Sequence, residues 1–383
     1  MNDVLGTNKR DVTIDIIKGL GIVFMVLGHS YFPFQKFIYL FHMAIFFIAS
    51  GYLYNEKYSD NIKSVIHFIG RKFKSLWFPY VLWTTIFTLL NNVLIKCNIY
   101  TDNPMLLEYV SGTYIHTTDY MSLKQMIINI IKSFFLSGHT QLGGAFWFIS
   151  TLMKLLVFYC IVDYLLKKII KHKYLLIAQI AVSVVLLAFG YFCSLKGYTF
   201  LGFAKVCSYY YLIVLGIFIK RYKISEKISA SNISYVVILV LSFVALLILE
   251  NFGSIGLDTN HYTNPLFFIA VSFIGWEFCF TISCLIKKVK ISSAIAYLGK
   301  NTMPIIILHF LSFKIVSLVG ILIDGSPMFL LAAFPVLYED GIWWIAYSLV
   351  GILIPIVFNY LYINVKNRIV NLIKSKKFIN RVN

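Results

Sequence analysis

The feature that most constrains the fold is a series of apolar stretches, each long enough to cross a lipid bilayer. A helix needs about 17–25 apolar residues for this. Such stretches lie at about 12–31, 37–54, 73–96, 145–166, 174–193, 200–219, 232–250, 262–286, 302–322 and 341–363. Only 13% of the residues are charged, against about 25% in soluble domains. The sequence therefore predicts an all-α polytopic membrane protein, with about ten transmembrane helices in a single domain over residues 1–383.

The basic residues alternate between the two ends of these stretches. Most of the 34 Lys and Arg residues lie in Lys9–Arg10, Lys57–Lys74, 167–173, 220–227, 287–300 and a basic tail from about residue 364. With ten spans all of these lie on one side, which the positive-inside rule assigns to the cytoplasm. We therefore expect both termini to be cytoplasmic. The net charge of +18 is explained by this topology, and we expect no nucleic-acid partner.

One connection, at about residues 97–144, is large and is predicted to be extracytoplasmic. Its stretch "SLKQMIINIIKSFFL" (residues 122–136) places Leu, Met, Ile and Phe on one helical face and Lys, Gln and Asn elsewhere. That pattern is typical of a helix lying along the membrane interface. Two roles stay open for this helix: sealing the bundle, or helping to dock an acceptor molecule.

Ionisable residues inside the apolar stretches predict a polar interior, because such groups at membrane depth normally face a bundle interior or a watery cavity. The first stretch carries Lys18 and His29, with Asp15 one turn before Lys18, and His42 begins the second. Lys18 and His29 lie about on one face of the helix, separated by roughly 16 Å. We expect Lys18 at the cytoplasmic end and His29 at the outer end.

A cationic inner mouth is predicted from Lys18 together with Arg71, Lys72 and Lys74. It suggests an anionic molecule that enters from the cytoplasm, with proton chemistry at the histidines farther out. Simpler interpretations stay open: the histidines as hydrogen-bonded packing residues, and the basic cluster as a topology signal alone.

Further ionisable residues occur in later stretches, at Lys154, Lys205, Glu277, His309 and Lys314. We interpret Lys154 and Glu277 as a structural ion pair. The fifth and seventh stretches are almost wholly apolar and are expected to face lipid. We expect no metal site, since none of the familiar zinc or phosphate-loop motifs is present.

Five motifs together resemble the acyltransferase family 3 membrane proteins. In order they are "RDVTIDIIKGLGIVFMVLGHS", "FHMAIFFIASGYLY", "RKFKSLWFPYVLW", "FWFISTL" and "LGKNTMPIIILHF". The opening pair is most similar to the fucose 4-O-acetylase-like subgroup. The resemblance covers the whole chain, and ten spans is the core expected of the family.

The resemblance implies a membrane O-acyltransferase of the bacterial plasma membrane. It would move an acyl group, commonly acetyl, from cytoplasmic acyl-CoA to a hydroxyl of an extracytoplasmic sugar or lipid-linked glycan. Acetyl-CoA would be a co-substrate, with no permanently bound cofactor. His29 matches the family's catalytic histidine, as a general base or a transient acyl carrier. Trp147 and His309 match interior positions to which no role is assigned.

Donor binding is implied for Lys18, Arg71 and Lys74. Lys18 stands where the family has Arg, and its Arg-x-x-Arg becomes Arg71-Lys-Phe-Lys74. Each lysine replaces a bidentate fork with a point charge, which keeps the attraction for phosphate and changes its geometry. Asp15 is expected to orient Lys18 or to pair with Arg10.

Two other functions fit a polytopic bundle with a polar interior. A lipid-linked sugar flippase or polysaccharide transporter would use the same cavity, but the paired broken helices common in transporters are not evident. A polysaccharide polymerase would be expected to carry arginines in its large outer loop, and the loop at 97–144 has none.

Overall fold

The fold is that of a helical bundle with one long terminal helix, and the computed structural model describes residues 11–109, 117–229 and 231–382. The helices α1–α8 are Val12–His29, Gln35–Tyr39, Ala44–Tyr52, Ile62–Lys72, Phe78–Lys96, Leu106–Tyr109, Leu123–Phe134 and Phe146–Ile169. The helices α9–α16 are Leu175–Lys196, Phe203–Tyr222, Ile224–Ile228, Asn232–Leu249, Pro265–Ile286, Ile291–Lys300, Thr302–Asp324 and Trp343–Val382.

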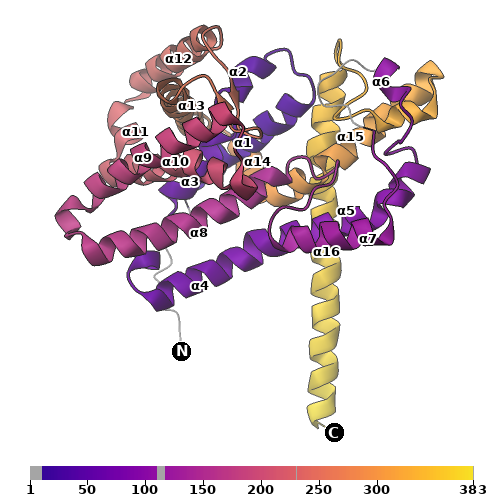
Figure 1. The fold of residues 1–383 in the computed structure, drawn as a ribbon, viewed down its shortest axis with the longest axis horizontal. Coiled ribbons are helices and arrows are strands. Elements are labelled where there is room, and N and C mark those ends of the chain that lie inside the picture. The colour runs from indigo at the N-terminus through magenta and orange to yellow at the C-terminus, as the bar shows by residue number, and fades with distance from the viewer. Residues whose placement is uncertain (1–10, 110–116, 230, 383) are drawn as a thin grey trace.

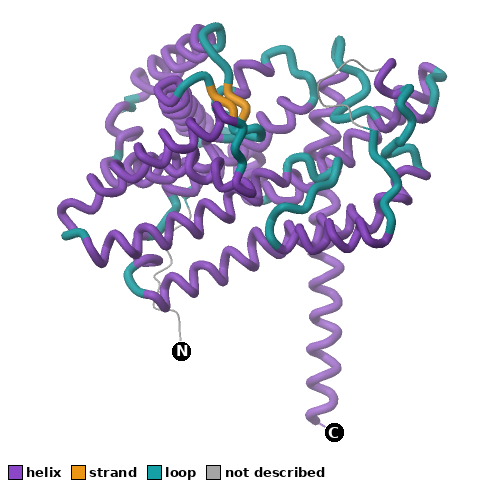
Figure 2. The backbone as a smooth tube through the Cα atoms, in the orientation of Figure 1, coloured by secondary structure: helices purple, strands orange, loops and turns teal. Residues whose placement is uncertain are grey.

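Short elements complete the described chain. They are η1 (Glu56–Ser59), η2 (Phe73–Trp77, a π-helical turn), η3 (His172–Tyr174), η4 (Phe200–Gly202), η5 (Met328–Ala332) and the strands β1 (Ile255–Gly256) and β2 (His261–Tyr262). The strands pair antiparallel as a small hairpin (Figure 2). α16 extends well beyond the other helices (Figure 1). Lys9 and Arg10, and with them the predicted Asp15–Arg10 pair, lie outside the described residues.

Nine helices of the described chain are long and apolar enough to cross a membrane. They correspond to the predicted spans with one exception and confirm an all-α polytopic fold. The third span is longer than predicted, since α4, η2 and α5 form one helical stretch from Ile62 to Lys96. As expected, α9 and α12 face outward: only 28% and 11% of their most apolar windows are buried.

The exception is the predicted span 37–54, which is not one long helix but the short helices α2 and α3 joined by turns. At its start, Gln35 and Tyr39 donate to the Gly28 carbonyl near the end of α1, over 2.6 and 2.8 Å. At its end, Tyr52 and Leu53 share a cavity with Lys18. The segment therefore spans the depth of α1. A broken helix is tolerated at membrane depth where protein surrounds it, and this segment is almost entirely buried.

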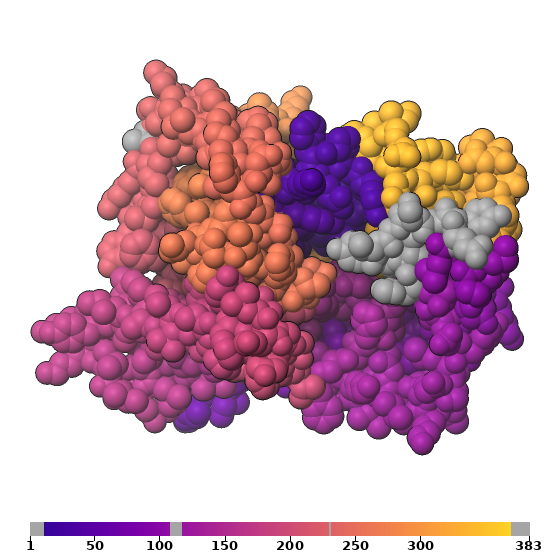
Figure 3. All heavy atoms as spheres, turned by 45° about the horizontal axis from the view of Figure 1, so that its top comes forward, coloured from indigo at the N-terminus to yellow at the C-terminus, as the bar shows by residue number. Residues whose placement is uncertain are grey.

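The first helix, α1, lies at the centre of the bundle. It begins at Val12 because the Asp11 carboxylate accepts from the Thr13 backbone N–H over 2.9 Å, an ordinary N-cap. In the space-filling view the indigo N-terminal segment lies between the orange part of the chain and the yellow C-terminal part (Figure 3). Asp15 is buried in the bundle, and Lys18 and His29 are half-buried.

A close backbone contact fixes α1 against α14, a short helix that does not correspond to any predicted span. A Cβ at Gly299 would lie 1.8 Å from the Asp15 carbonyl oxygen, and one at Gly19 would lie 2.0 Å from the Ile295 carbonyl oxygen. Small residues permit such approaches between helices in membranes. This contact sets the position of the α1 turns that carry Asp15 and Lys18.

Gly299→Ala should destabilise the bundle, because the added methyl must push α14 from α1; overpacking of this kind costs about 1–3 kcal/mol. Thermal unfolding of the purified protein in detergent should show a lower midpoint. Gly70→Ala is the matched control, since a Cβ there meets nothing within 4 Å and Ala favours a helix. Equal midpoints for the two variants would contradict the close contact.

The alternation of basic connections predicts which sites face the same solution. In a Cys97→Ser background, which removes the exposed native thiol, single cysteines at Lys171, Lys223 and Lys288 should react from the cytoplasmic side. Cysteines at Thr259 and Asp324 should react from the opposite side. Labelling with a membrane-impermeant maleimide in intact and permeabilised cells measures this; both sets reacting from one side would overturn the ten crossings.

Candidate active site

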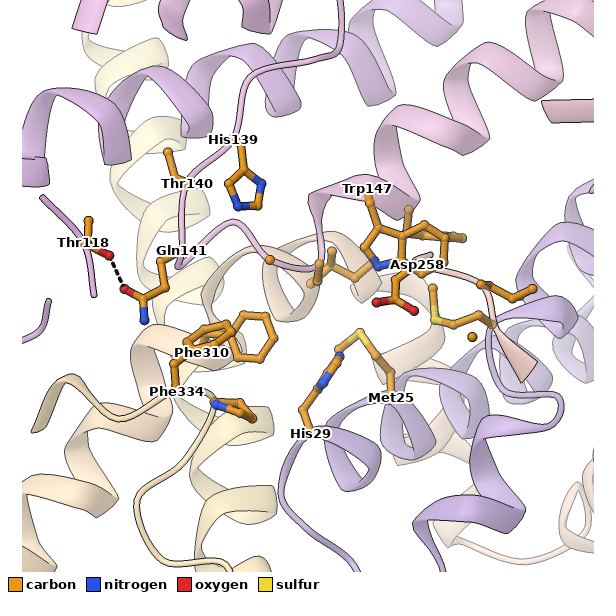
Figure 4. Close-up of a pocket in the computed structure, with 18 of the residues that line it drawn as sticks. Met25, His29, Thr118, His139, Thr140, Gln141, Trp147, Asp258, Phe310 and Phe334 are labelled. Carbon is orange, nitrogen blue, oxygen red and sulfur yellow. Dashed lines mark hydrogen bonds between the residues drawn. The ribbon is translucent and has the colours of Figure 1, made fainter. Parts of the chain in front are cut away.

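The end of α1 opens into a cavity of about 870 Å³, which we call the His29 cavity. Met25 and His29 of α1 lie on one wall, and Trp147, Phe310, Phe334 and Asp258 come from other parts of the bundle (Figure 4). The predicted outer loop contributes Thr118, His139 and Gln141, and α7 contributes Gln125. Among the described residues, no Lys or Arg lines this cavity.

His29 is half-buried at the last turn of α1, and its ring points into the cavity (Figure 4). It stacks on His309, with ring centroids 5.4 Å apart and planes 27° apart, and it contacts Phe310 at 4.9 Å. Packing on two sides restricts the ring orientation. One edge of the imidazole is left available to the cavity contents.

His309 and His42 have the same hydrogen-bonding arrangement. The Nδ1 of His309 lies 2.9 Å from the Ile305 carbonyl oxygen, and that of His42 lies 3.0 Å from the Ile38 carbonyl oxygen. Since a carbonyl only accepts, we infer that each neutral ring carries its proton on Nδ1 and a lone pair on Nε2. Within the described chain, the Nε2 of His309 is buried without a hydrogen-bond partner, which for a polar atom next to His29 calls for an explanation.

A second cavity, of about 1530 Å³, surrounds the other end of α1, and we call it the Lys18 cavity. Asp15, Lys18 and Arg71 line it. Arg71 lies over the Tyr58 ring, 4.3 Å from the centroid, and its Nε is buried without a hydrogen-bond partner among the described residues. Lys74, in contrast, is exposed and does not line this cavity.

Cations predominate in the Lys18 cavity. The Lys and Arg residues among its described lining are Lys18, Lys57, Arg71, Lys167, Lys220 and Arg221, and the acids are Asp11, Asp15, Glu56 and Asp60. Two ion pairs fix one wall: Arg221 to Glu56 at 2.7 Å and Lys167 to Asp60 at 2.9 Å. The excess positive charge suits an anionic ligand.

The interior lysines of the later spans do not form the predicted ion pair. Lys154 donates to the Leu136 and Leu201 carbonyls over 3.3 and 2.9 Å, and Glu277 accepts from Ser225 over 2.6 Å. The pairing of Lys154 with Glu277 is therefore wrong. Backbone carbonyls that are freed where helices end satisfy the lysine instead, as caps do elsewhere.

Lys314 is held in the same way. Its buried ammonium donates to the Leu331 and Ala333 carbonyls over 3.0 and 2.5 Å. Phe334 and Pro335, which follow directly, form part of the His29 cavity wall. Lys314 thus acts as a structural support for that wall.

Two residues of this region were not singled out as site residues. Lys205 donates to the Asp258 backbone oxygen and lies over the Trp147 ring, 5.4 Å from its centroid. Asp258 sits in the β1–β2 hairpin, far in sequence from α1. Only the turn-forming residues "GLDTN" (256–260) could have signalled a hairpin there.

Comparison with known proteins identifies the family. The model of the acyltransferase 3 family, described as an acyltransferase domain, matches residues 11–363. The chain belongs to the acyltransferase 3 family. The match includes both cavities and every candidate residue from Asp15 to His309.

Two curated relatives share part of this acyltransferase 3 chain. Nodulation protein NolL of Mesorhizobium japonicum is 34% identical over 124 residues, 28% of this chain and 33% of that protein. Nodulation protein NolL of Sinorhizobium fredii is 33% identical over 91 residues, 20% of this chain and 24% of that protein. The matched segments thus span a third or less of these relatives. No solved structure matches the chain significantly.

Within this family member, α1 joins the two cavities. Asp15 and Lys18 line one cavity, and Met25 and His29 line the other. The prediction that Lys18 and His29 share one helix face is consistent with where they lie. His42 and Trp147 join His29, Arg71 joins Lys18, and His309 touches His29 from behind the cavity wall.

Proposed function

We propose that this protein transfers an acetyl group from cytoplasmic acetyl-CoA to a hydroxyl of an extracytoplasmic sugar or lipid-linked glycan. The observation that carries the proposal is the contrast between the two cavities on α1. One is rich in cations; the other presents His29 among polar groups and, in its described lining, has carboxylates but no Lys or Arg. An acetyl transfer between a charged donor and a neutral acceptor needs this combination.

The donor side of the proposal rests on Lys18 and Arg71. Coenzyme A carries its phosphates at one end and its thiol at the other, joined by the pantetheine arm. Phosphate oxygens form strong charge-assisted hydrogen bonds with Lys and Arg, and the buried Nε of Arg71 has no partner within the described chain. Phosphates at the Lys18 cavity would direct the thioester along α1 toward His29.

The acceptor side rests on the polar lining of the His29 cavity. Its volume lies in the range of about 300–1,000 Å³ that is usual for small-molecule sites. Gln141 and Thr118, joined by a 2.9 Å hydrogen bond, and Asn91 offer neutral donors and acceptors. These groups suit a sugar hydroxyl, as in the fucose 4-O-acetylase-like subgroup that the opening motifs resemble.

His29 acts where the hydroxyl meets the thioester carbonyl. As a general base it takes the hydroxyl proton while the oxygen forms the new ester bond; the C–S bond breaks, and the proton passes to the departing CoA thiolate. As an acyl carrier, its nitrogen would first take the acetyl group while the C–S bond breaks and the CoA thiolate leaves. The hydroxyl oxygen would then form the ester bond as the bond from acetyl to nitrogen breaks, and its proton would pass to the freed imidazole and on to the thiolate.

Substitution in the Lys18 cavity tests the donor site. Arg71→Ala and Lys18→Ala should each weaken acetyl-CoA binding about 10- to 100-fold, because hydrogen bonds to charged groups contribute about 1.5–3 kcal/mol. Lys18→Arg should be tolerated, since it keeps the charge and adds a bidentate fork. Isothermal titration of the purified protein measures the affinities. Lys74→Ala is the matched control, because that side chain is exposed outside the cavity.

An unchanged affinity in Arg71→Ala would mean that the basic cluster sets topology alone. Equal losses in Arg71→Ala and Lys74→Ala would point to the overall charge of this face. Either result would remove the donor site from the Lys18 cavity.

His29→Ala should reduce acetyl transfer about 10²- to 10⁴-fold, the usual contribution of general acid–base catalysis, while acetyl-CoA binding stays intact. The assay is transfer to an external acceptor by protein reconstituted in vesicles loaded with acetyl-CoA. His42→Ala should keep more activity, because His42, in the turn after α2, is hydrogen-bonded to the Ile38 carbonyl and stacked on Tyr39. His67→Ala, an exposed histidine on α4, is the control.

Near-normal turnover by His29→Ala would exclude His29 from the mechanism. The search would then move to His42 and His309. Loss of acetyl-CoA binding in the same variant would instead indicate that the substitution disturbs α1 as a whole.

A further inference from the structure

The β1–β2 hairpin, which connects α12 to α13, reaches into the bundle and is rigidly held there. Ile255 and Leu257 are buried, and the Leu257 carbonyl accepts from the Tyr209 hydroxyl over 2.5 Å. Asn260, next to the turn, donates to the Gly190 carbonyl over 3.4 Å. Lys205 holds the Asp258 backbone oxygen. The hairpin is therefore a fixed platform for the side chain of Asp258.

Asp258 places a carboxylate in the wall of the His29 cavity. The side chain is directed into the cavity, on the side of Trp147 (Figure 4). Within the described chain, no hydrogen bond or ion pair engages its carboxylate oxygens, although its backbone oxygen is bonded to Lys205. A carboxylate ordered in this way, with Lys205 near enough to interact with its charge but no hydrogen bond to its oxygens in the described chain, is available for a ligand that donates hydrogen bonds.

Trp147 and Asp258 lie near each other, as shown by the Lys205 ammonium, which contacts both residues. That ammonium lies 5.4 Å from the centre of the Trp147 ring and donates to the backbone of Asp258. The indole also lines the cavity. An aromatic ring next to an available carboxylate offers an apolar face and a strong acceptor to one ligand.

Charge decides which ligand fits. Lys205 already occupies the cation–π position on Trp147 and offsets the charge of Asp258, so the pair does not favour an ammonium group. The other carboxylate of the described lining, Asp119, belongs to the predicted outer loop and is exposed. An anionic group is also disfavoured, since no Lys or Arg is part of the described lining. A neutral polyol remains: its ring C–H groups can pack on the indole while its hydroxyls donate to the carboxylate.

We propose that Trp147 and Asp258 form the acceptor-recognition subsite, which binds a neutral pyranose and presents another of its hydroxyls to His29. The inference rests on the proposed acetyl transfer and names the residues that select its acceptor. No hydrogen bond in the described chain joins Asp258 to His29, so the carboxylate binds the sugar and does not activate the histidine directly.

The test compares Asp258→Asn with the wild type. The full chain, in lipid nanodiscs, receives radiolabelled acetyl-CoA and a panel of methyl pyranosides: neutral sugars, their 2-amino-2-deoxy analogues and their 6-phosphates. Neutral pyranosides should be the best acceptors. Asp258→Asn should raise the KM for the best of them about 10- to 100-fold, since a hydrogen bond to a charged group is lost, while the KM for acetyl-CoA stays unchanged.

Two further variants separate recognition from folding. Glu250→Gln removes a carboxylate from the same connection outside the cavity and should leave both KM values unchanged. Trp147→Phe, which keeps a smaller aromatic face, should raise the acceptor KM less than Trp147→Ala does. A purely structural role would lower kcat or protein yield in the Asp258 and Trp147 variants without a selective change in the acceptor KM.

Other outcomes overturn the inference. An unchanged acceptor KM in Asp258→Asn, or a preference for the amino or phosphate analogues, would reject this subsite while leaving acetyl transfer intact. If the wild type acetylates no pyranoside and consumes no acetyl-CoA, the proposed function itself fails. If it acetylates a non-sugar hydroxyl, the donor half of the proposal stands and the subsite falls.

Discussion

The constraint on which the structure depends is that the polar groups of α1 cannot face lipid. A lysine at the centre of a bilayer costs about 3 kcal/mol or more, and Asp15, Lys18 and His29 all lie on this one helix. The bundle surrounds α1 with other helices, while the apolar α9 and α12 face outward. The glycine contact with α14 completes the enclosure at the end that carries Asp15 and Lys18.

The fold could be predicted from the sequence wherever a helix spans the membrane as one continuous apolar run. The prediction failed at residues 37–54, where hydropathy is high but the helix is broken at 40–43. A run of apolar residues indicates that a segment is buried. It does not tell whether the segment is buried in protein or in lipid. Only lipid demands an unbroken helix. The helix α14 was missed because its ten residues are too few to span a membrane.

The candidate site was predictable where its residues share one helix. The spacing of Lys18 and His29 follows from helix geometry alone, and the two cavities lie where that spacing puts them. Lys74 shows the limit of prediction from sequence spacing: it is only three residues from Arg71 and yet lies outside the Lys18 cavity. Asp258 and Lys205 could not be found in this way, because the hairpin that brings them to Trp147 is a tertiary arrangement.

The difference in charge between the cavities also gives the proposed donor a single orientation. Phosphate groups moved to the His29 cavity would lose their cationic partners, because no Lys or Arg is found in its described lining. An uncompensated charge in such an enclosed site is costly. The thioester, which is uncharged, meets no such barrier. The electrostatics of the two cavities therefore favour the arrangement in which the acetyl group of the proposed donor reaches His29. In that arrangement the phosphates stay away from the sugar that Asp258 and Trp147 would hold.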